Sequence, residues 1–312
     1  MKYSTRKKLF GFCLVLPWII GFVVFLLYPL SQTILYSFSN VTITPQGTET
    51  APVGFKNYTD VLFTDPDFTL GIPAFLRQMV FMVPMIVVFS LLFALLLNSH
   101  IRGQRIYRAI FFLPVILISG PVLERIRQVG ATNLPGVDSF FVFQFIYNQV
   151  PPVLSSPIQY IISNIVLIFW FSGVQVLIFL SGLQKVDNSL YEASMVDGAS
   201  AWQRFWKITI PVVKPFILLI AVYTVVDIAL SSLSPFTKVI QDGMFAPSKG
   251  FGFSSAASWL YFLFVLAALL LAFLVFGRKE KDPMRQKDKE RRRAARRAEK
   301  RHRQAQREGL GA

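Results

Sequence analysis

Six long apolar segments alternate with polar stretches along the chain. The apolar segments cover residues 9–30, 74–98, 108–124, 158–181, 212–234 and 253–277. About 20 apolar residues in a helix cross the hydrocarbon core of a bilayer, where each unpaired backbone group costs several kcal/mol. The pattern therefore predicts an all-α membrane protein with six transmembrane helices.

The first apolar segment follows four basic residues, as the apolar region of a signal peptide does. It is too long for such a region, and no small-residue cleavage site follows it. Cys13 lies near the start of the segment, whereas a lipoprotein cysteine comes after the apolar run. We therefore expect this segment to be retained as the first membrane helix.

Composition and charge support this interpretation. Of the 312 residues, 54% are apolar and 16% are charged, whereas soluble proteins are about a quarter charged. The single cysteine excludes an intramolecular disulfide framework and a CxxC metal or redox site. The net charge is +15, and residues 278–312 contribute 15 basic and 6 acidic side chains to it. We expect a transmembrane domain over residues 1–277 and a basic cytoplasmic tail over residues 278–312.

The distribution of lysine and arginine predicts the orientation, because basic residues are retained on the cytoplasmic side during insertion. With the N-terminus inside, the inner segments hold 26 basic residues and the outer segments hold 6. Without the tail, the comparison is 11 against 6. We therefore expect a multi-pass protein of the cell membrane whose two termini both lie in the cytoplasm.

The polar loop over residues 184–211 is predicted to form two short helices on the cytoplasmic side. Two residue pairs have the spacing of a capping box: Ser189 with Glu192, and Ser200 with Gln203. Between them, Gly198 can adopt the positive φ that ends a helix. Pro211 then ends the second helix or begins the next one.

This loop resembles the EAA loop of binding-protein-dependent ABC transporter permeases, whose pattern runs E-A-A, three residues to G, then I-x-L-P. Ser194 and Ile210 depart from the usual residues but are of similar size. The matching residues are Glu192, Ala193, Ser194, Asp197, Gly198, Ala199, Phe205, Ile208, Ile210 and Pro211.

The resemblance extends over about residues 5–277 and is to the sugar-uptake, maltose-permease-like branch of the family. Its further motifs are Leu16-Pro17, Tyr28-Pro29-Leu30, Ser37-Phe38, Gly54-Phe55-Lys56-Asn57-Tyr58 and Arg108-Ala109-Ile110-Phe111-Phe112-Leu113-Pro114. The resemblance implies the permease fold of a type I ABC importer. It also implies three partners, namely ABC ATPase subunits, a second homologous permease subunit and an extracellular solute-binding protein.

In this family the loop forms a coupling helix that docks on the ATPase subunit. The resemblance implies that Glu192 makes a polar contact there and that Gly198 allows the close turn. The alternative is that Glu192 only caps its own helix and Gly198 only ends it. We favour docking in addition to capping, because a juxtamembrane loop has no evident need for the whole pattern.

Polar residues inside the predicted spans are candidates for the substrate pathway. A charged side chain within a bilayer costs roughly 2.5–3.5 kcal/mol and normally faces a cavity or a partner. Polar groups and aromatic rings of this kind also suit a sugar. The alternative is that these groups join helices by hydrogen bonds. The candidates are Asp227 with Tyr223 and Ser231 on one predicted helix face, and Asn164, Phe171 and Gln175 on another.

The chain has no GxxxxGK[ST] phosphate-binding loop, so ATP is expected to be bound by partner subunits and no cofactor by this chain. His100 and His302 are isolated in the sequence and predict neither a metal site nor a catalytic pair. No span contains a paired nucleophile and base or a carboxylate pair. We therefore do not expect an enzyme.

The basic tail contains the cluster Arg291-Arg292-Arg293 and has few apolar residues. We expect a solvated, charged extension that reinforces the topology. Contact with anionic membrane lipids is an alternative, because a polybasic segment follows a membrane helix directly. Nucleic-acid binding is disfavoured, since charge without aromatic or fold context is poor evidence for it.

Together these features predict the permease subunit of an ATP-driven importer for a sugar or oligosaccharide delivered by a solute-binding protein. One alternative is the same machinery for another solute, such as a glycerol-phosphate or a polyamine. Asp227 disfavours an anionic solute through like-charge repulsion. Another alternative is a non-transporting membrane scaffold whose tail binds lipid or RNA.

Overall fold

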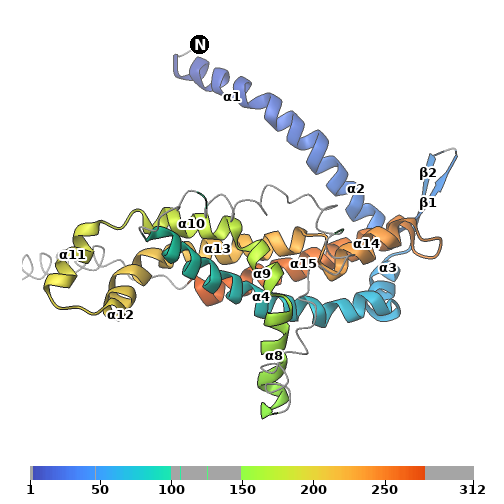
Figure 1. Ribbon diagram of the computed structural model, residues 1–312. Coiled ribbons are helices and arrows are strands. Elements are labelled where there is room, and N and C mark those ends of the chain that lie inside the picture. Colours follow the sequence, from blue (N-terminus) through green and yellow to red (C-terminus); the bar gives the residue numbers. More distant parts are fainter. Residues whose placement is uncertain (1–2, 46, 100–105, 107–124, 126–148, 278–312) are drawn as a thin grey trace, which may run out of the picture.

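The computed structural model describes residues 3–45, 47–99, 106, 125 and 149–277. The predicted third span, 108–124, and the basic tail, 278–312, lie outside the described residues. Within the described residues the chain is mostly helical, as Figure 1 shows.

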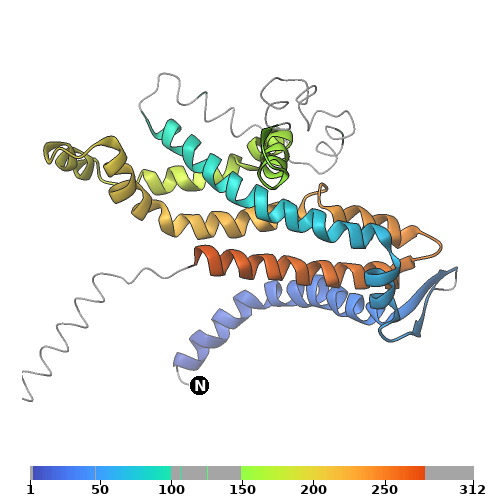
Figure 2. The same ribbon diagram turned by 90° about the horizontal axis from the view of Figure 1, so that it is seen from below.

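An elongated bundle forms the body of the protein, and its long helices lie side by side in Figure 2. A short two-stranded hairpin lies at one end of the bundle, here called the hairpin end. The loop over residues 184–211 projects from the opposite end, here called the loop end. The long helices of the bundle are α4 (Pro66–Asn98), α13 (Ile210–Leu230) and α15 (Gly250–Phe276), and the shorter α10 (Gly173–Leu183) packs among them.

The N-terminal segment forms one long apolar helix in three parts, which begins away from the bundle and joins it near the hairpin end (Figure 1). The helical run therefore extends seven residues beyond the predicted 9–30. The π-helical turn η1 in its middle carries no buried side chain, and much of the run is exposed. Its parts are α1 (Tyr3–Phe22), η1 (Val23–Leu27) and α2 (Tyr28–Ser37).

Within the described residues, four helical runs are long and apolar enough to cross a membrane, or five if one bent helix pair counts as a span. The second, fifth and sixth predicted spans each coincide with such a helix, although the helix ends differ from the predicted ones. The second begins at Pro66 instead of residue 74, because Asp65 caps the helix by accepting a hydrogen bond from the Phe68 N–H (2.8 Å). The fifth ends at Leu230 instead of residue 234.

The predicted fourth span, 158–181, is not one continuous helix. It is divided into α8 (Pro152–Ser163), α9 (Ile165–Phe171) and α10, with a bend of 53° between the last two. Asn164 ends α8, and its side chain donates to the Tyr160 carbonyl (2.7 Å). Polar side chains that bond to the backbone compete with helical hydrogen bonding, which explains breaks at asparagine and serine.

One short hairpin departs from the expected all-α fold. Strands β1 (Ser39–Thr44) and β2 (Gly47–Pro52) form an antiparallel pair, with Ser39 opposite Pro52. The short turns α3 (Lys56–Thr59) and η2 (Asp60–Thr64) follow it and lead into α4. The sequence also gave no prediction of α14 (Pro235–Phe245), which lies between α13 and α15.

One asparagine joins the hairpin to the bundle. The Asn57 side chain donates hydrogen bonds to the carbonyls of Ser37 (3.0 Å) and Ser39 (2.9 Å). Gly252 on α15 packs directly beneath these groups, and a Cβ at this position would collide with the Ser39 carbonyl oxygen. The end of α2, the hairpin and α15 therefore meet at a glycine.

Aromatic rings fill the core near the hairpin end. Phe236 of α14 is fully buried and lies 4.7 Å from Phe68 and 4.9 Å from Tyr261 between ring centroids. The Tyr261 hydroxyl donates to the Ala229 carbonyl (2.6 Å) and accepts from Ser234 (2.8 Å). This chain of contacts fixes α14 against α4, α13 and α15.

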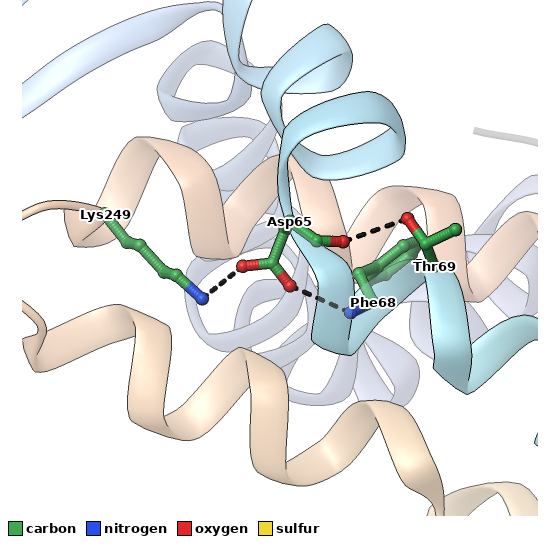
Figure 3. A network of polar contacts seen from close by, with 4 residues as sticks. All are labelled: Asp65, Phe68, Thr69 and Lys249. Atoms are coloured by element: carbon green, nitrogen blue, oxygen red, sulfur yellow. Dashed lines mark hydrogen bonds and ion pairs between the residues drawn. The ribbon is translucent and has the colours of Figure 1, made fainter.

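An ion pair closes the hairpin end (Figure 3). The Lys249 ammonium bonds to one carboxylate oxygen of Asp65, and the other oxygen caps α4. The backbone carbonyl of Asp65 also accepts from the Thr69 hydroxyl (2.9 Å). Asp65 is buried, so its charge requires these partners. The pair joins the start of α4 to the residue before α15, 184 positions later in the sequence.

The close approach at Gly252 gives a stability prediction. We expect Gly252→Ala to lower the thermal unfolding midpoint of the protein in nanodiscs, because the new methyl group meets backbone atoms that cannot rotate away. The control is Gly21→Ala, where nothing lies within 4 Å of the added carbon. A glycine in a helix costs roughly 0.5–1 kcal/mol relative to alanine, so the control should be neutral or stabilising. Equal midpoints for the two variants would contradict this account of the packing.

Candidate functional site

The loop over residues 184–211 forms two short helices at the loop end, as the sequence predicted. They are α11 (Asn188–Val196) and α12 (Ala201–Arg204), and both project beyond the bundle in Figure 1. The second predicted capping box is confirmed. The Ser200 hydroxyl accepts from the Gln203 N–H (3.3 Å), and the Gln203 side chain accepts from the Ser200 N–H (2.9 Å).

The first predicted capping box, between Ser189 and Glu192, was wrong. Helix α11 begins two residues earlier than that box requires, and Asp187 is its cap. The Asp187 carboxylate accepts from the Ser189 N–H (3.0 Å), and this hydrogen bond lowers the pKa of Asp187. The negative charge of this carboxylate also suits a helix N-terminus. Glu192 is therefore not used as a cap, and its side chain is exposed.

The turn between the two helices depends on Gly198, which has the predicted positive φ (76°). The Gly198 N–H donates to the Met195 carbonyl (3.0 Å), and the Ala199 N–H donates to the Ser194 carbonyl (2.9 Å). These bonds satisfy carbonyls at the end of α11 in the manner of a glycine C-cap. Open space surrounds Gly198, so its role here is the backbone conformation.

The residues of the EAA pattern divide into an exposed group and a half-buried group. Glu192, Ala193, Asp197 and Gly198 are exposed, and so is Pro211 in the first turn of α13. The half-buried members support the loop from within: Ser194, Ala199, Phe205 and Ile208. An exposed edge of α11 is thus available for a partner.

A hydrogen bond that the sequence reasoning missed joins the two arms of the loop. The hydroxyls of Tyr191 in α11 and Thr209 lie 2.9 Å apart, and Thr209 is buried. Thr209 ends the π-helical turn η4 (Phe205–Thr209), which connects α12 to α13 without a break. This hydrogen bond therefore connects α11 to the base of a long apolar helix. A tyrosine 18 residues before a threonine gave no local sign of this contact.

Aromatic side chains gather where the loop joins α13. The Trp202 and Trp206 rings meet edge to face at 5.6 Å, and Phe205 lies 5.2 Å from Trp206. Trp202 is 69% exposed and Trp206 is 51% exposed. The sequence analysis singled out Phe205 but not the two tryptophans, whose spacing of four residues places them on one helix face.

Helices α10 and α13, which flank the loop, are in close contact inside the bundle. A Cβ on Gly182 would lie 2.9 Å from the Phe216 ring, so the two helices approach closely at this point. Further along, the Gln175 side chain donates to the Thr224 hydroxyl (3.2 Å), and both residues are fully buried. Thr224 in turn donates to the Ile220 carbonyl (2.7 Å).

Three of the predicted pathway residues come together at this contact. The side chain of Gln175 also interacts with the half-buried carboxylate of Asp227, one turn beyond Thr224. Tyr223 lies near the same carboxylate and is 37% exposed. The carbonyl oxygen of Gln175 is buried and has no protein partner within the described residues. Its unused acceptor and the carboxylate are the kinds of group that a polyol hydroxyl donates to.

The remaining predicted pathway residues lie elsewhere. Asn164 is at the break between α8 and α9, so it does not share a continuous helix face with Gln175. Phe171 is 3% exposed and belongs to the hydrophobic core. Ser231 follows the end of α13 in an extended conformation (ψ 151°), and its hydroxyl donates to the Ile228 carbonyl. Within the described segments, no group of three metal-ligating side chains is assembled.

Comparison with known proteins identifies the family. A family model described as the inner membrane component of binding-protein-dependent transport systems matches residues 71–278. The chain belongs to this family. Its members are membrane-embedded transport permeases and not enzymes, which agrees with the sequence analysis.

Similar proteins include several permeases. The probable ABC transporter permease protein YesP of Bacillus subtilis is 29% identical over 292 residues, which cover 86% of this chain and 91% of YesP. The multiple sugar-binding transport system permease MsmF of Streptococcus mutans is 29% identical over 70% of this chain and 73% of its own length. The trehalose/maltose permease MalF of Thermococcus litoralis is 28% identical over 72% and 75%.

A solved structure shares the fold. It is a bacterial ABC transporter involved in the import of the acidic polysaccharide alginate, with a TM-score of 0.61 and 19% sequence identity. The match covers 89% of this chain and 98% of the alginate transporter chain. The permease fold of an ABC importer, which the sequence resemblance implied, is therefore present.

The caps of the loop helices can be tested by substitution. We expect Ser200→Ala to destabilise α12 locally by about 1 kcal/mol, because the capping hydroxyl is lost. Ser189→Ala is the matched control, since the Asp187 carboxylate caps α11 instead. Hydrogen exchange of the full-length protein should be faster near residues 201–204 in the first variant only. Faster exchange of α11 in Ser189→Ala would contradict this assignment and favour the capping box predicted from the sequence, with Ser189 as the cap.

Proposed function

We propose that this chain is a transmembrane permease subunit of an ATP-driven importer that takes up a sugar or oligosaccharide. A solute-binding protein delivers the solute outside, ATPase subunits act on the cytoplasmic side, and a second permease completes the pathway. The chain forms six spans with both termini in the cytoplasm. The start of α1 and the loop 184–211 lie toward the same end of the bundle in Figure 2, which supports this orientation.

The loop 184–211 carries the proposal. Its EAA pattern lies on an exposed helix that projects from the bundle, and the Tyr191–Thr209 hydrogen bond ties that helix to α13. The exposed apolar side chains of α11 suit a protein partner: Leu190, Met195 and Val196. Glu192 lies on the same short helix and uses none of its oxygens for capping, so it is free to make a polar contact. An ATPase that docks here pulls on α13 when it closes.

The Gln175–Asp227 group is the proposed substrate contact. It lies on the two helices that flank the docking loop, so movement of the loop changes its surroundings. Asp227 accepts hydrogen bonds from solute hydroxyls, while Tyr223 offers a ring and a hydroxyl one turn away. Asn164, Phe171 and Ser231 are structural in this arrangement.

The names of the relatives favour a sugar as the solute. MsmF is a multiple sugar-binding transport system permease and MalF of Thermococcus litoralis is a trehalose/maltose permease. The alginate transporter imports an acidic polysaccharide. The Asp227 carboxylate repels an anionic solute, so we propose a neutral sugar or oligosaccharide here.

The docking role predicts the loss of a complex. We expect Glu192→Lys and Gly198→Pro each to abolish co-elution of the ATPase subunit with the tagged permease. The first variant reverses the proposed polar contact, and the second cannot adopt the φ of 76°.

Glu49→Lys is the control for charge reversal, because Glu49 is exposed at the hairpin end, far from the loop. This variant should keep the ATPase. Retention of the full complex by both loop variants would refute docking at this loop.

The pathway role predicts a loss of transport without a loss of assembly. A hydrogen bond to a charged group contributes about 1.5–3 kcal/mol, so Asp227→Ala should reduce uptake by roughly tenfold or more. Ser258→Ala is the matched control, because this hydroxyl bonds only within α15, to the Ser254 carbonyl. Radiolabelled sugar uptake in proteoliposomes measures the effect. Unchanged uptake by Asp227→Ala would make Asp227 a packing residue.

A further inference from the structure

The two helices of the loop end belong to segments of opposite charge. Residues 187–198, which include α11, hold three carboxylates and neither lysine nor arginine. Residues 199–214, which include α12 and η4 and reach the start of α13, hold three basic side chains and neither aspartate nor glutamate. The two segments therefore suit partners of different charge. The carboxylates are those of Asp187, Glu192 and Asp197, and the basic residues are Arg204, Lys207 and Lys214.

The aromatic cluster of the basic segment lies at the depth of the lipid headgroups. Helix α13 has 21 residues, so at about 1.5 Å per residue its length matches the roughly 30 Å of a bilayer's hydrocarbon core. Trp206 precedes its first residue, Ile210, by about one helical turn, and η4 joins the two without a break. The headgroup layer on each side of the core is roughly 5–7 Å thick, which is also about one turn. Trp206 therefore lies at the level where tryptophan is enriched in membrane proteins.

The side chains of this segment offer contacts that the described part of the chain does not use. Trp202 and Trp206 are both more than half exposed, and they stack only on each other and on Phe205. Neither Arg204 nor Lys207 forms an ion pair among the described residues, and the buried Nε of Arg204 has no acceptor there. Guanidinium and ammonium groups bind phosphate, and an indole ring has an apolar body with one polar N–H. Together these groups suit an anionic phospholipid headgroup.

We propose that α12 and η4 rest on the inner leaflet of the membrane and bind anionic phospholipid headgroups. The rings of Trp202 and Trp206 insert at the headgroup level, and Arg204 and Lys207 bond to lipid phosphates. The same negative surface repels the acidic α11, which is left for the ATPase. The lipid thus holds one part of the loop while the partner docks on the other. This inference rests on the proposed function, which places the loop end in the cytoplasm.

Photo-cross-linking of the assembled transporter identifies what lies against each segment. Benzoylphenylalanine replaces Trp206 in one sample and Val196 in another, and Val196 is 89% exposed at the end of α11. Both samples are irradiated in nanodiscs that contain equal amounts of phosphatidylglycerol and phosphatidylethanolamine. We expect mass spectrometry to find phospholipid adducts at position 206, with phosphatidylglycerol in excess, and an ATPase adduct at position 196.

Removal of one charge tests the contact with the headgroups. In the sample labelled at position 206, Lys207→Gln should lower the ratio of phosphatidylglycerol to phosphatidylethanolamine adducts about fivefold, which is the contribution of one basic side chain at an anionic surface. The matched control is Lys238→Gln, because Lys238 is also an exposed lysine but lies on α14 at the hairpin end. This variant should leave the ratio unchanged.

The absence of a phospholipid adduct at position 206 would overturn the proposal, whether the group reacts with the ATPase, with a permease or with neither. A ratio that Lys207→Gln leaves unchanged would overturn the contact between the basic residues and the headgroups. Failure of the proposed function has a different signature, because position 196 would then give no ATPase adduct.

Discussion

The contact between α10 and α13 determines what the rest of the protein can do. These helices approach closely at Gly182 and Phe216, and the hydrogen bond between Gln175 and Thr224 holds them in register inside the bundle. A polar pair of this kind is retained in a membrane because both groups lack water as an alternative partner. The two ends of the loop 184–211 are therefore anchored on a fixed pair of helices. The Tyr191–Thr209 hydrogen bond then links the outer part of the loop to the same base.

The hairpin end is held together differently from the loop end. There, polar contacts link segments that are far apart in the sequence, notably Asp65 with Lys249 and Asn57 with the end of α2. These contacts surround buried aromatic rings, so this end is both cross-linked and well packed. The loop end instead exposes apolar and aromatic side chains on short helices. The two ends therefore differ in how much of their surface is left for other proteins.

The sequence predicted the features that depend on local chemistry. The spans at residues 74–98, 212–234 and 253–277 follow from apolar content, and the capping box at Ser200 and the turn at Gly198 follow from residue type. The errors arose where a neighbouring polar group competed with the expected one. Asp187 caps α11 in place of Ser189, because its carboxylate accepts from the Ser189 N–H, the group that the predicted box assigned to the Glu192 side chain.

Tertiary relationships could not be predicted from local patterns. The helix face predicted for Asn164 and Gln175 assumed an unbroken helix, and side-chain bonding to the backbone divides that helix into pieces. Ser231 was placed on the face of Asp227, but α13 ends one residue before it. Gln175 and Thr224 are 49 residues apart in the sequence, and only the packing of α10 against α13 brings their side chains together.

The central claim is that ATP hydrolysis by a partner acts through the loop to move solute past Asp227. It is tested most directly by reconstituting this chain in proteoliposomes with the second permease, ATPase and solute-binding protein encoded by neighbouring genes. We predict that the sugar-loaded binding protein stimulates ATP hydrolysis and that sugar enters the vesicles only when ATP is present. The account would be contradicted if the assembled complex hydrolysed ATP at the same rate with and without the loaded binding protein and took up no sugar.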